Sequence, residues 1–312
     1  MADKMATREA YGNTLKELGA KYPNLVVMDA DLSGSTKTAV FAKEYPERFF
    51  NMGIAEQNMY GAAAGLALSG KIVCASTFAM FASGRAFEII RNSIGYTHAN
   101  VKVCATHAGI TVGEDGASHQ TFEDIALMRT IPGMTVVNPS DGASAAELLR
   151  QVIAMYGPAY VRLGRAAVPF FYSEETAKDI RLGKGNTLRE GKDVTIIATG
   201  IMVSEAMTAA EELAVEGIDC RVIDMHTIKP LDEEIIVKAS KETGKIVTAE
   251  EHSVIGGLGS AVAECVSVNA PCRILMVGQK DTFGESGKPE ELKQKYGMTA
   301  SDIYKAVHQI MK

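Results

Sequence analysis

Short apolar runs that alternate with helix-length segments are the feature of this sequence that most restricts its fold. In the first half, predicted strands lie at 25–28, 72–77, 101–105, 134–139 and 160–163. The second half repeats the pattern, with predicted strands at 194–198, 220–224, 245–249 and 273–277. Such alternation predicts mainly parallel sheets with helices on both faces. The predicted fold class is therefore α/β, with two doubly wound, mainly parallel-sheet domains.

The length of the chain, 312 residues, favours two domains of ordinary size. A polar, charged and glycine-containing stretch at 173–192 separates the two sets of predicted strands. We therefore predict a first domain at 1–172, a linker at 173–192 and a second domain at 193–312.

Charge and composition exclude several classes of protein. The formal net charge of −6 argues against a general nucleic-acid binder. The polar N-terminus and the lack of an 18-residue apolar run predict neither a secretion signal nor a membrane span. Five cysteines without a Cys-x-x-Cys pair indicate buried, reduced thiols, and hence a cytoplasmic protein.

A predicted helix at 54–70 carries one isolated acid. Between Arg48 and Lys71, Glu56 is the only charged residue. A carboxylate is costly to bury among small apolar residues, so a buried Glu56 must be paired or protonated. This pattern is typical of a functional acid in a dry site. An exposed first-turn glutamate, stabilised by the helix dipole, explains the spacing equally well.

Polar loops follow several of the predicted strands, at the sheet edge where α/β proteins bind ligands. The loop 29–36 carries Asp31 and Ser35, and is either a phosphate cradle or a simple cluster of turn residues. The loop 106–120 carries two histidines and two acids, which favours a polar substrate site. Their spacing matches no zinc pattern, and no metal ligand is assigned.

Two features of the second half are open to a structural interpretation. The glycine-rich turn 255–259 is not a complete dinucleotide fingerprint, and close packing of a helix on a strand explains it as well. The charged run 250–252 ends a predicted strand, and we assign it a structural role rather than a functional one.

Three ordered motifs carry a resemblance to a known family: Gly53-Ile54-Ala55-Glu56-Gln57, Ser76-Thr77-Phe78-Ala79-Met80-Phe81, and Gly113-Glu114-Asp115-Gly116-Ala117-Ser118-His119-Gln120. With them the chain resembles the C-terminal half of transketolase, which contains a pyrimidine-binding domain and a transketolase C-terminal domain. The resemblance implies a thiamine diphosphate enzyme. It would transfer a two-carbon ketol unit from a ketose phosphate to an aldose phosphate, as in the pentose phosphate pathway.

The resemblance also assigns residues to the cofactor. Glu56 matches the glutamate that hydrogen-bonds N1′ of the aminopyrimidine and so promotes proton removal from the thiazolium ring. Phe81 matches the ring that stacks on the aminopyrimidine, with Phe78 beside it, and Asp31 joins this cofactor-binding set. Transketolases commonly place a third aromatic where this chain has Gly84, a departure that predicts a more open pyrimidine pocket.

The substrate residues implied by the resemblance fall in the first helix and in the strand-end loops. Four match positions that bind the sugar phosphate, and two match positions near the reacting hydroxyls. The phosphate residues are Arg8, Ser35, His107 and Arg165, and the hydroxyl residues are Asp115 and His119. Together with Glu56, both histidines are assigned to catalysis.

One motif of the family is missing. Thiamine diphosphate enzymes hold the diphosphate through Mg²⁺ (or Ca²⁺) bound by a Gly-Asp-Gly motif, which this sequence lacks. A diphosphate needs a metal or several cations. The resemblance therefore implies a split transketolase whose N-terminal subunit supplies that motif, in an α2β2 heterotetramer with the Glu56 helix at the interface.

Three alternatives remain. A synthase of the deoxyxylulose-phosphate type shares part of the motifs but commonly has arginine in place of Phe81. The β subunit of a 2-oxo acid dehydrogenase has a similar length, yet its substrate lacks a phosphate for Arg8 and Arg165 to bind. A non-catalytic regulatory partner would have no use for Glu56, Asp115 and the two histidines.

Overall fold

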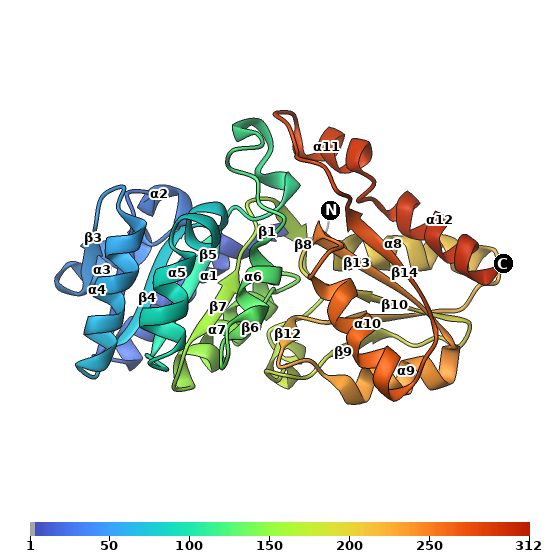
Figure 1. Ribbon diagram of the computed structural model, residues 1–312, viewed down its shortest axis with the longest axis horizontal. Helices are drawn as coiled ribbons and strands as arrows, with labels where there is room; N and C mark the ends of the chain where they lie inside the picture. Colours follow the sequence, from blue (N-terminus) through green and yellow to red (C-terminus); the bar gives the residue numbers. More distant parts are fainter. Residues whose placement is uncertain (1–3) are drawn as a thin grey trace.

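The computed structural model describes residues 4–312, so the first residues of the polar N-terminus lie outside the described part. Two lobes lie side by side, and in each a twisted sheet is packed between helices (Figure 1). The predicted α/β class with two doubly wound, mainly parallel sheets is confirmed.

The sheet of the first lobe has seven strands in the order β12-β6-β7-β5-β4-β2-β3. Its own strands are β2 (Leu25–Asp29), β3 (Phe49–Asn51), β4 (Ile72–Phe78), β5 (Val101–Thr106), β6 (Thr135–Val137) and β7 (Ala159–Arg162). All of them pair in parallel. Their carboxyl ends therefore meet at one edge, where the polar loops of the sequence come together.

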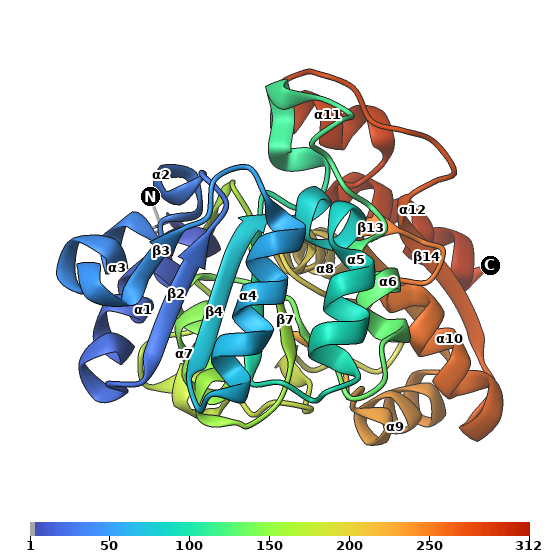
Figure 2. The same ribbon diagram turned by 60° about the vertical axis from the view of Figure 1, so that its left-hand side comes forward.

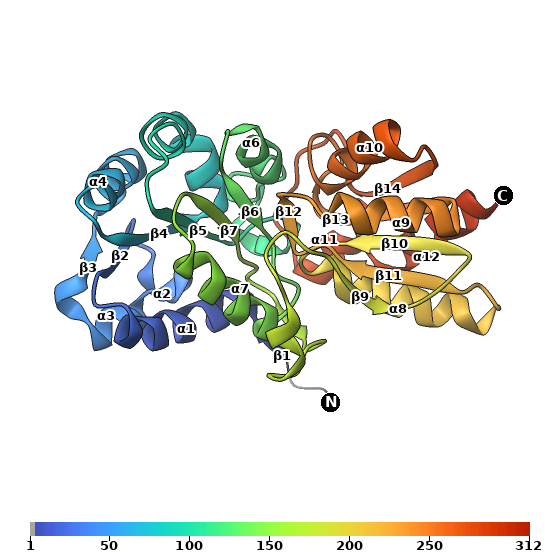
Figure 3. The same ribbon diagram turned by 90° about the horizontal axis from the view of Figure 1, so that it is seen from below.

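Helices cover both faces of this sheet, as the view from below shows (Figure 3). One face carries α4 (Glu56–Leu68), α5 (Phe87–Ile89) and α6 (Asp124–Thr130), and the other carries α1 (Thr7–Lys21), α3 (Ala39–Glu44) and α7 (Gly142–Ala154). The segment from Phe81 to Gly95 is not one regular α-helix: wide π-helical turns, η2 (Phe81–Arg85) and η3 (Ile90–Gly95), flank α5. π-helical turns occur frequently at functional sites.

The second lobe has five strands in the order β14-β13-β10-β11-β9. They are β9 (Asn186–Arg189), β10 (Val194–Ala198), β11 (Cys220–Asp224), β13 (Lys245–Ser253) and β14 (Arg273–Gln279). The core on one face includes α8 (Met202–Val215) and α12 (Ala300–Met311), and the core on the other includes α9 (Glu233–Thr243) and α10 (Leu258–Asn269). The antiparallel strand β9 falls within the predicted linker 173–192, so part of that stretch belongs to the second sheet.

The two lobes share a sheet. The strand β12 (Thr227–Lys229) comes from the second half of the chain and pairs with β6 of the first. The remaining elements are short: β1 (Lys4–Ala6), α2 (Ser33–Thr36), η1 (Pro46–Arg48), η4 (Ile110–Asp115), β8 (Ala167–Pro169), η5 (Thr176–Asp179) and α11 (Pro289–Tyr296). The turn η4 packs against α11 across the lobe boundary (Figure 2).

Side-chain size explains how α4 reaches the sheet. Its buried face includes Ala63, Ala64 and Ala67, and their small side chains bring the helix close to the strands. On its exposed face Gly61 and Gly65 have open space around them. All five cysteines carry free thiols. Within residues 4–312, no helix has the length and apolar character required to cross a membrane.

Candidate active site

Glu56 is the first residue of α4, and its side chain is only 2% exposed. Both carboxylate oxygens accept a hydrogen bond from Nη1 of Arg85, each at 2.8 Å. Of the two possibilities left open by the sequence, burial with a partner is therefore the observed one. Arg85 comes from the π-helical turn η2, and its own side chain is 47% exposed.

Two phenylalanines lie beside this ion pair. Phe78 ends β4 and Phe81 begins η2, and their rings are nearly parallel, with centroids 6.0 Å apart. The guanidinium carbon of Arg85 lies 4.5 Å from the centroid of Phe81, within the range of a cation–π contact. His119 meets Phe81 edge-on at 5.3 Å.

A cavity of about 260 Å³ lies beside Glu56 and Phe81. Its wall includes Asp31, Ile54, Glu56, Phe81, Arg85 and His119. Asp31 is held at a positive φ of 63°, and its carboxylate accepts a hydrogen bond from Asn51. The structure thus brings Asp31, Glu56, Phe81 and His119, four of the residues selected from the sequence, to one cavity.

A second group of selected residues lies next to this cavity. The His107 ring stacks on Phe78 with centroids 3.9 Å apart, and Arg8 lies 3.3 Å from its Nε2. An arginine can only donate, so Nε2 accepts and Nδ1 carries the proton, which faces Thr106 Oγ1 at 2.9 Å. Arg8 also donates to the backbone carbonyl of Ser35.

The electrostatics of this group favour an anion. Burial first, and then the positive charges of Arg8 and Arg165, lower the pKa of His107 to about 3. The ring is therefore neutral at neutral pH. Lys37, which the sequence analysis did not select, adds another positive charge to the surroundings of His107. Cations gathered at strand ends suit a phosphate or another oxyanion.

Arg165 and Asp115 stand at the outer side of this cluster. Arg165 donates to the carbonyl of Val112 and lies 3.4 Å from Glu114 and 4.0 Å from Asp115. Asp115 is 43% exposed, whereas Glu56 in the cavity wall is 2% exposed. The structure therefore places Asp115 beside Arg165 rather than in the cavity that contains Glu56.

Met80 lies next to Gly84. A Cβ built on Gly84 would lie 2.4 Å from the terminal methyl of Met80, so a flexible methionine takes the place beside the glycine. Neither residue lines the cavity described above, and the more open pyrimidine pocket stays a prediction.

The charged run 250–252 has a structural role. The carboxylate of Glu250 accepts hydrogen bonds from the backbone N–H groups of Leu258 and Gly259, at 2.7 and 2.8 Å, and so fills the N-terminus of α10. Gly257 leaves room for it, since a Cβ there would lie 2.0 Å from Glu250 Oε2. The turn 255–259 is therefore occupied by the chain's own carboxylate, which leaves no phosphate site at this helix.

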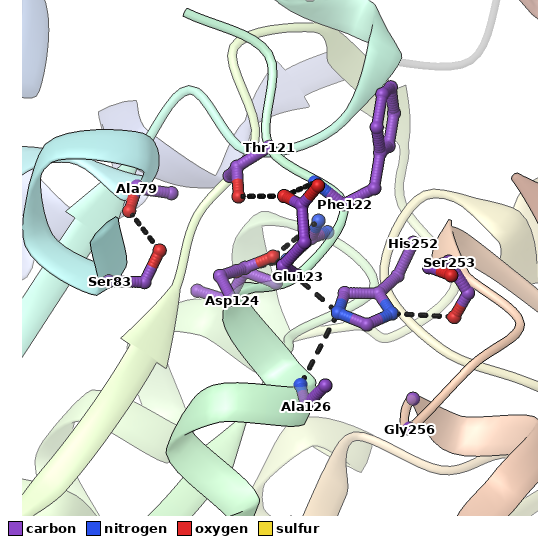
Figure 4. A network of polar contacts seen from close by, with 12 residues as sticks. Ala79, Ser83, Thr121, Phe122, Glu123, Asp124, Ala126, His252, Ser253 and Gly256 are labelled. Atoms are coloured by element: carbon purple, nitrogen blue, oxygen red, sulfur yellow. Dashed lines mark hydrogen bonds and ion pairs between the residues drawn. The ribbon is translucent and has the colours of Figure 1, made fainter. Parts of the chain in front are cut away.

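His252 joins the two lobes. Its Nε2 accepts a hydrogen bond from the backbone of Ala126 in α6, and its Nδ1 faces the carbonyl of Ser253 at 2.7 Å (Figure 4). Nearby, Asp124 accepts from Tyr160 and Arg162, both nearly fully buried. These hydrogen bonds pair the buried polar groups at the lobe boundary, and the bond between His252 and Ala126 holds α6 against the second sheet.

The cavity also fits the planar ring of an aminopyrimidine. The buried carboxyl group of Glu56 lines this space, where it accepts hydrogen bonds when ionised and can donate one when protonated, and Phe81 forms a flat wall beside it. Across residues 4–312, no three His, Cys, Asp or Glu side chains come together in a way that would hold a metal ion.

The sequence analysis did not select Arg85 or Lys37. For Arg85 a signal was present, because a lone buried acid requires a cation as its partner.

Comparison with known proteins agrees with this geometry. The family model of the transketolase pyrimidine-binding domain matches residues 3–170, and that of the transketolase C-terminal domain matches residues 183–303. The chain is 56% identical to a protein of Methanocaldococcus jannaschii described as "Putative transketolase C-terminal section", over 98% of this chain and 96% of that protein. It is 45% identical to the 6-deoxy-6-sulfo-D-fructose transketolase subunit SqwH of Clostridium sp. (strain MSTE9), over 97% of this chain and 94% of that one.

A solved structure described as "Split gene transketolase, inactive beta4 tetramer" matches with a TM-score of 0.91 and 56% identity, and covers 98% of each chain. Transketolases depend on thiamine diphosphate and transfer two-carbon ketol units. The chain belongs to the transketolase family, and it corresponds to the C-terminal section of a split transketolase, with a pyrimidine-binding and a C-terminal domain.

Proposed function

We propose that this chain supplies the acid-bearing half of a two-subunit transketolase active site. The observation that carries the proposal is the buried Glu56 carboxylate beside Phe81, in a cavity adjacent to a cluster of cations. An N-terminal subunit with a Gly-Asp-Gly motif would bind the diphosphate through Mg²⁺. The expected assembly is an α2β2 heterotetramer in which the exposed face of α4 lies at the interface.

Thiamine diphosphate supplies, when bound, the nucleophilic carbon that takes up and releases the two-carbon unit. In this chain Glu56 would share a proton with the aminopyrimidine ring, and Phe81 would hold that ring in plane. His119, which lies edge-on to Phe78, would contact a hydroxyl of the donor sugar near the reaction centre. Asp115 would bind the α-hydroxyl. His107, whose ring stacks on Phe78, would join the residues that bind the sugar phosphate.

Arg8, Ser35 and Arg165 would bind the terminal phosphate of the sugar. Arg8 already donates to the Ser35 carbonyl, so the loop and the first helix are held together before any substrate arrives. A neutral His107 leaves the arginines as the charged partners of the phosphate. Guanidinium groups bind phosphate with two parallel hydrogen bonds, which favours a phosphorylated sugar over an uncharged one.

The first experiment is a native mass measurement of the complex purified from its own cells. A second subunit in equal copy number that carries Gly-Asp-Gly is the expected result. The purified pair should then transfer a two-carbon unit from xylulose 5-phosphate to ribose 5-phosphate, and should not decarboxylate pyruvate. A homo-oligomer that shows no such activity with any co-purified chain would contradict the proposal.

A further inference from the structure

One side chain of this chain, Arg85, contacts both the buried acid Glu56 and the ring of Phe81 in the cavity. Arg85 donates from Nη1 to both oxygens of Glu56 at 2.8 Å, and its guanidinium lies 4.5 Å from the centroid of Phe81. Among residues 4–312, Glu56 has no other side-chain partner within hydrogen-bond distance. The pairing is therefore specific to one side chain.

A guanidinium resembles an aminopyrimidine in the properties that this site can recognise. Both groups are planar, both present nitrogen atoms to a carboxyl group, and both lie against an aromatic face. The π-helical turn η2 makes this possible because it brings Arg85 back over Phe81 one turn later. Arg85 thus makes the two contacts that the proposed function gives to the cofactor ring.

Arg85 and the cofactor ring compete for the same oxygen atoms. Both oxygens of Glu56 accept hydrogen bonds from Arg85 Nη1, so neither is available to a ring nitrogen while Arg85 is in place. The proton transfer proposed for this site needs a carboxyl group that can donate one to a ring nitrogen. Arg85 and the cofactor ring therefore cannot both hold Glu56 in the way that each of them requires.

We propose, on the basis of the proposed function, that Arg85 is a placeholder for the aminopyrimidine ring. It satisfies the buried carboxylate of Glu56 while the cofactor is absent, and it withdraws when the cofactor binds. Its backbone stays in place, because the side chain of Gln57 donates to the Arg85 carbonyl at 3.1 Å. Its side chain is 47% exposed, so a path into solvent is open.

The placeholder lowers the apparent affinity for the cofactor by a predictable amount. If the closed pair is populated in more than nine-tenths of the molecules, the apparent dissociation constant rises about tenfold or more, since only the remaining fraction can bind. Removal of the guanidinium should therefore tighten cofactor binding, which is the opposite of what the loss of an ordinary contact residue would do.

The test is calorimetric titration of thiamine diphosphate, in the presence of Mg²⁺, into the complex of this chain with its partner subunit. Arg85→Met removes the guanidinium and keeps an unbranched side chain. The expected result is a dissociation constant at least about tenfold lower than that of the unmodified complex. Arg91→Met is the matched control, because Arg91 is exposed on η3 and its side chain donates a hydrogen bond to the adjacent Asn92. It should leave the constant unchanged.

A second variant and a stated contradicting outcome make the test independent of whether the Met variant assembles. Arg85→Lys retains the charge but not the planar group, and a tightening of about threefold or more is expected from it even if the Met variant does not assemble. A dissociation constant equal to or higher than that of the unmodified complex, in whichever Arg85 variant assembles, overturns the placeholder while leaving the proposed function intact. If the unmodified complex binds no thiamine diphosphate, both proposals are overturned.

Discussion

The guanidinium of Arg8 lies 3.3 Å from Nε2 of His107, although the two residues are 99 positions apart in the sequence. Arg8 stands in the first turn of α1 and His107 directly after β5. Burial first, and the neighbouring arginines second, lower the pKa of His107 to about 3. The histidine is therefore an acceptor for Arg8 rather than a charged ligand, and the positive charge of the cluster resides on the arginines.

Replacement of Arg8 should weaken binding of the sugar phosphate more than it slows turnover. For Arg8→Gln we expect the KM for a phosphorylated donor to rise about 10- to 100-fold, because a charge-assisted hydrogen bond contributes about 1.5–3 kcal/mol. Steady-state kinetics with a phosphorylated and an unphosphorylated ketose provide the measurement. An equal rise in KM for both sugars would show that Arg8 does not read the phosphate.

Glu56 should be required for turnover but not for assembly. For Glu56→Gln we expect kcat of the two-subunit complex to fall about 100-fold or more, in line with the loss of a positioned proton donor. The native mass of the complex should not change, because the amide has the same shape. Glu88→Gln, the same substitution at an exposed site on α5, is the control and should retain full activity. Unchanged kcat in the Glu56 variant would favour a non-catalytic role for the chain.

The two members of the ion pair between Glu56 and Arg85 should contribute unequally to the free energy of unfolding. Arg85→Met leaves a buried carboxylate without a donor and should lower the free energy of unfolding of the isolated chain by about 1–3 kcal/mol. Glu56→Gln should cost less than about 1 kcal/mol, because the half-exposed Arg85 can be hydrated. Urea denaturation of both single variants and the double variant measures their coupling. Equal costs for the two single substitutions would mean that Glu56 reaches water once Arg85 is gone.

The convergence of the polar loops could be predicted from the sequence alone. Parallel strands bring their carboxyl ends to one edge, so Asp31, His107 and Arg165 were expected to lie near one another before their distances were known. Arg8 donates to the backbone carbonyl of Ser35, so the first helix and the loop 29–36 lie together at this edge. The alternation of apolar runs and helix-length segments predicts that the strands are parallel, and this shared direction brings their loops to one edge.

The relationship of Arg85 to Glu56 was not predictable in the same way. A lone buried acid requires a cation, but which one depends on the π-helical turn η2, whose wide spacing no apolar periodicity reveals. The strand β12 was missed for a related reason. It has only three residues and pairs with β6, some ninety positions earlier, so nothing local marks it as a strand.

A buried acid in the second lobe leads to a prediction about pH. Asp224 ends β11 and is fully buried. Its Oδ2 accepts hydrogen bonds from Ser140 and Tyr172, whereas its Oδ1 has no partner among residues 4–312. Burial, which the hydrogen bonds only partly offset, raises the pKa of Asp224 to about 7, well above the ordinary value of an aspartate.

The sign of the effect follows from proton uptake. Between the two pKa values the folded chain holds a proton on Asp224 that the unfolded chain has released, so stability falls as pH rises from about 4 to about 7. Above about pH 7 Asp224 is ionised in the folded chain too, and the free-energy cost of burying its carboxylate lowers the stability by a constant amount. Asp224→Asn removes the charge, and at pH 8.5 we expect it to raise the free energy of unfolding by about 1–3 kcal/mol. At pH 4 the variant and the unmodified chain should be nearly equally stable.

Urea denaturation of the isolated chain at both pH values checks this expectation, and Asp281→Asn is the control because Asp281 is exposed. The control should change stability little at either pH. The opposite result would be an Asp224→Asn variant that is less stable than the unmodified chain at pH 8.5, with a smaller loss of stability at pH 4. That result would show that the ionised carboxylate is stabilised by its surroundings. In that case Oδ1 would have to receive a hydrogen bond, and an ordered water molecule beside Ser140 and Tyr172 would be the donor to look for.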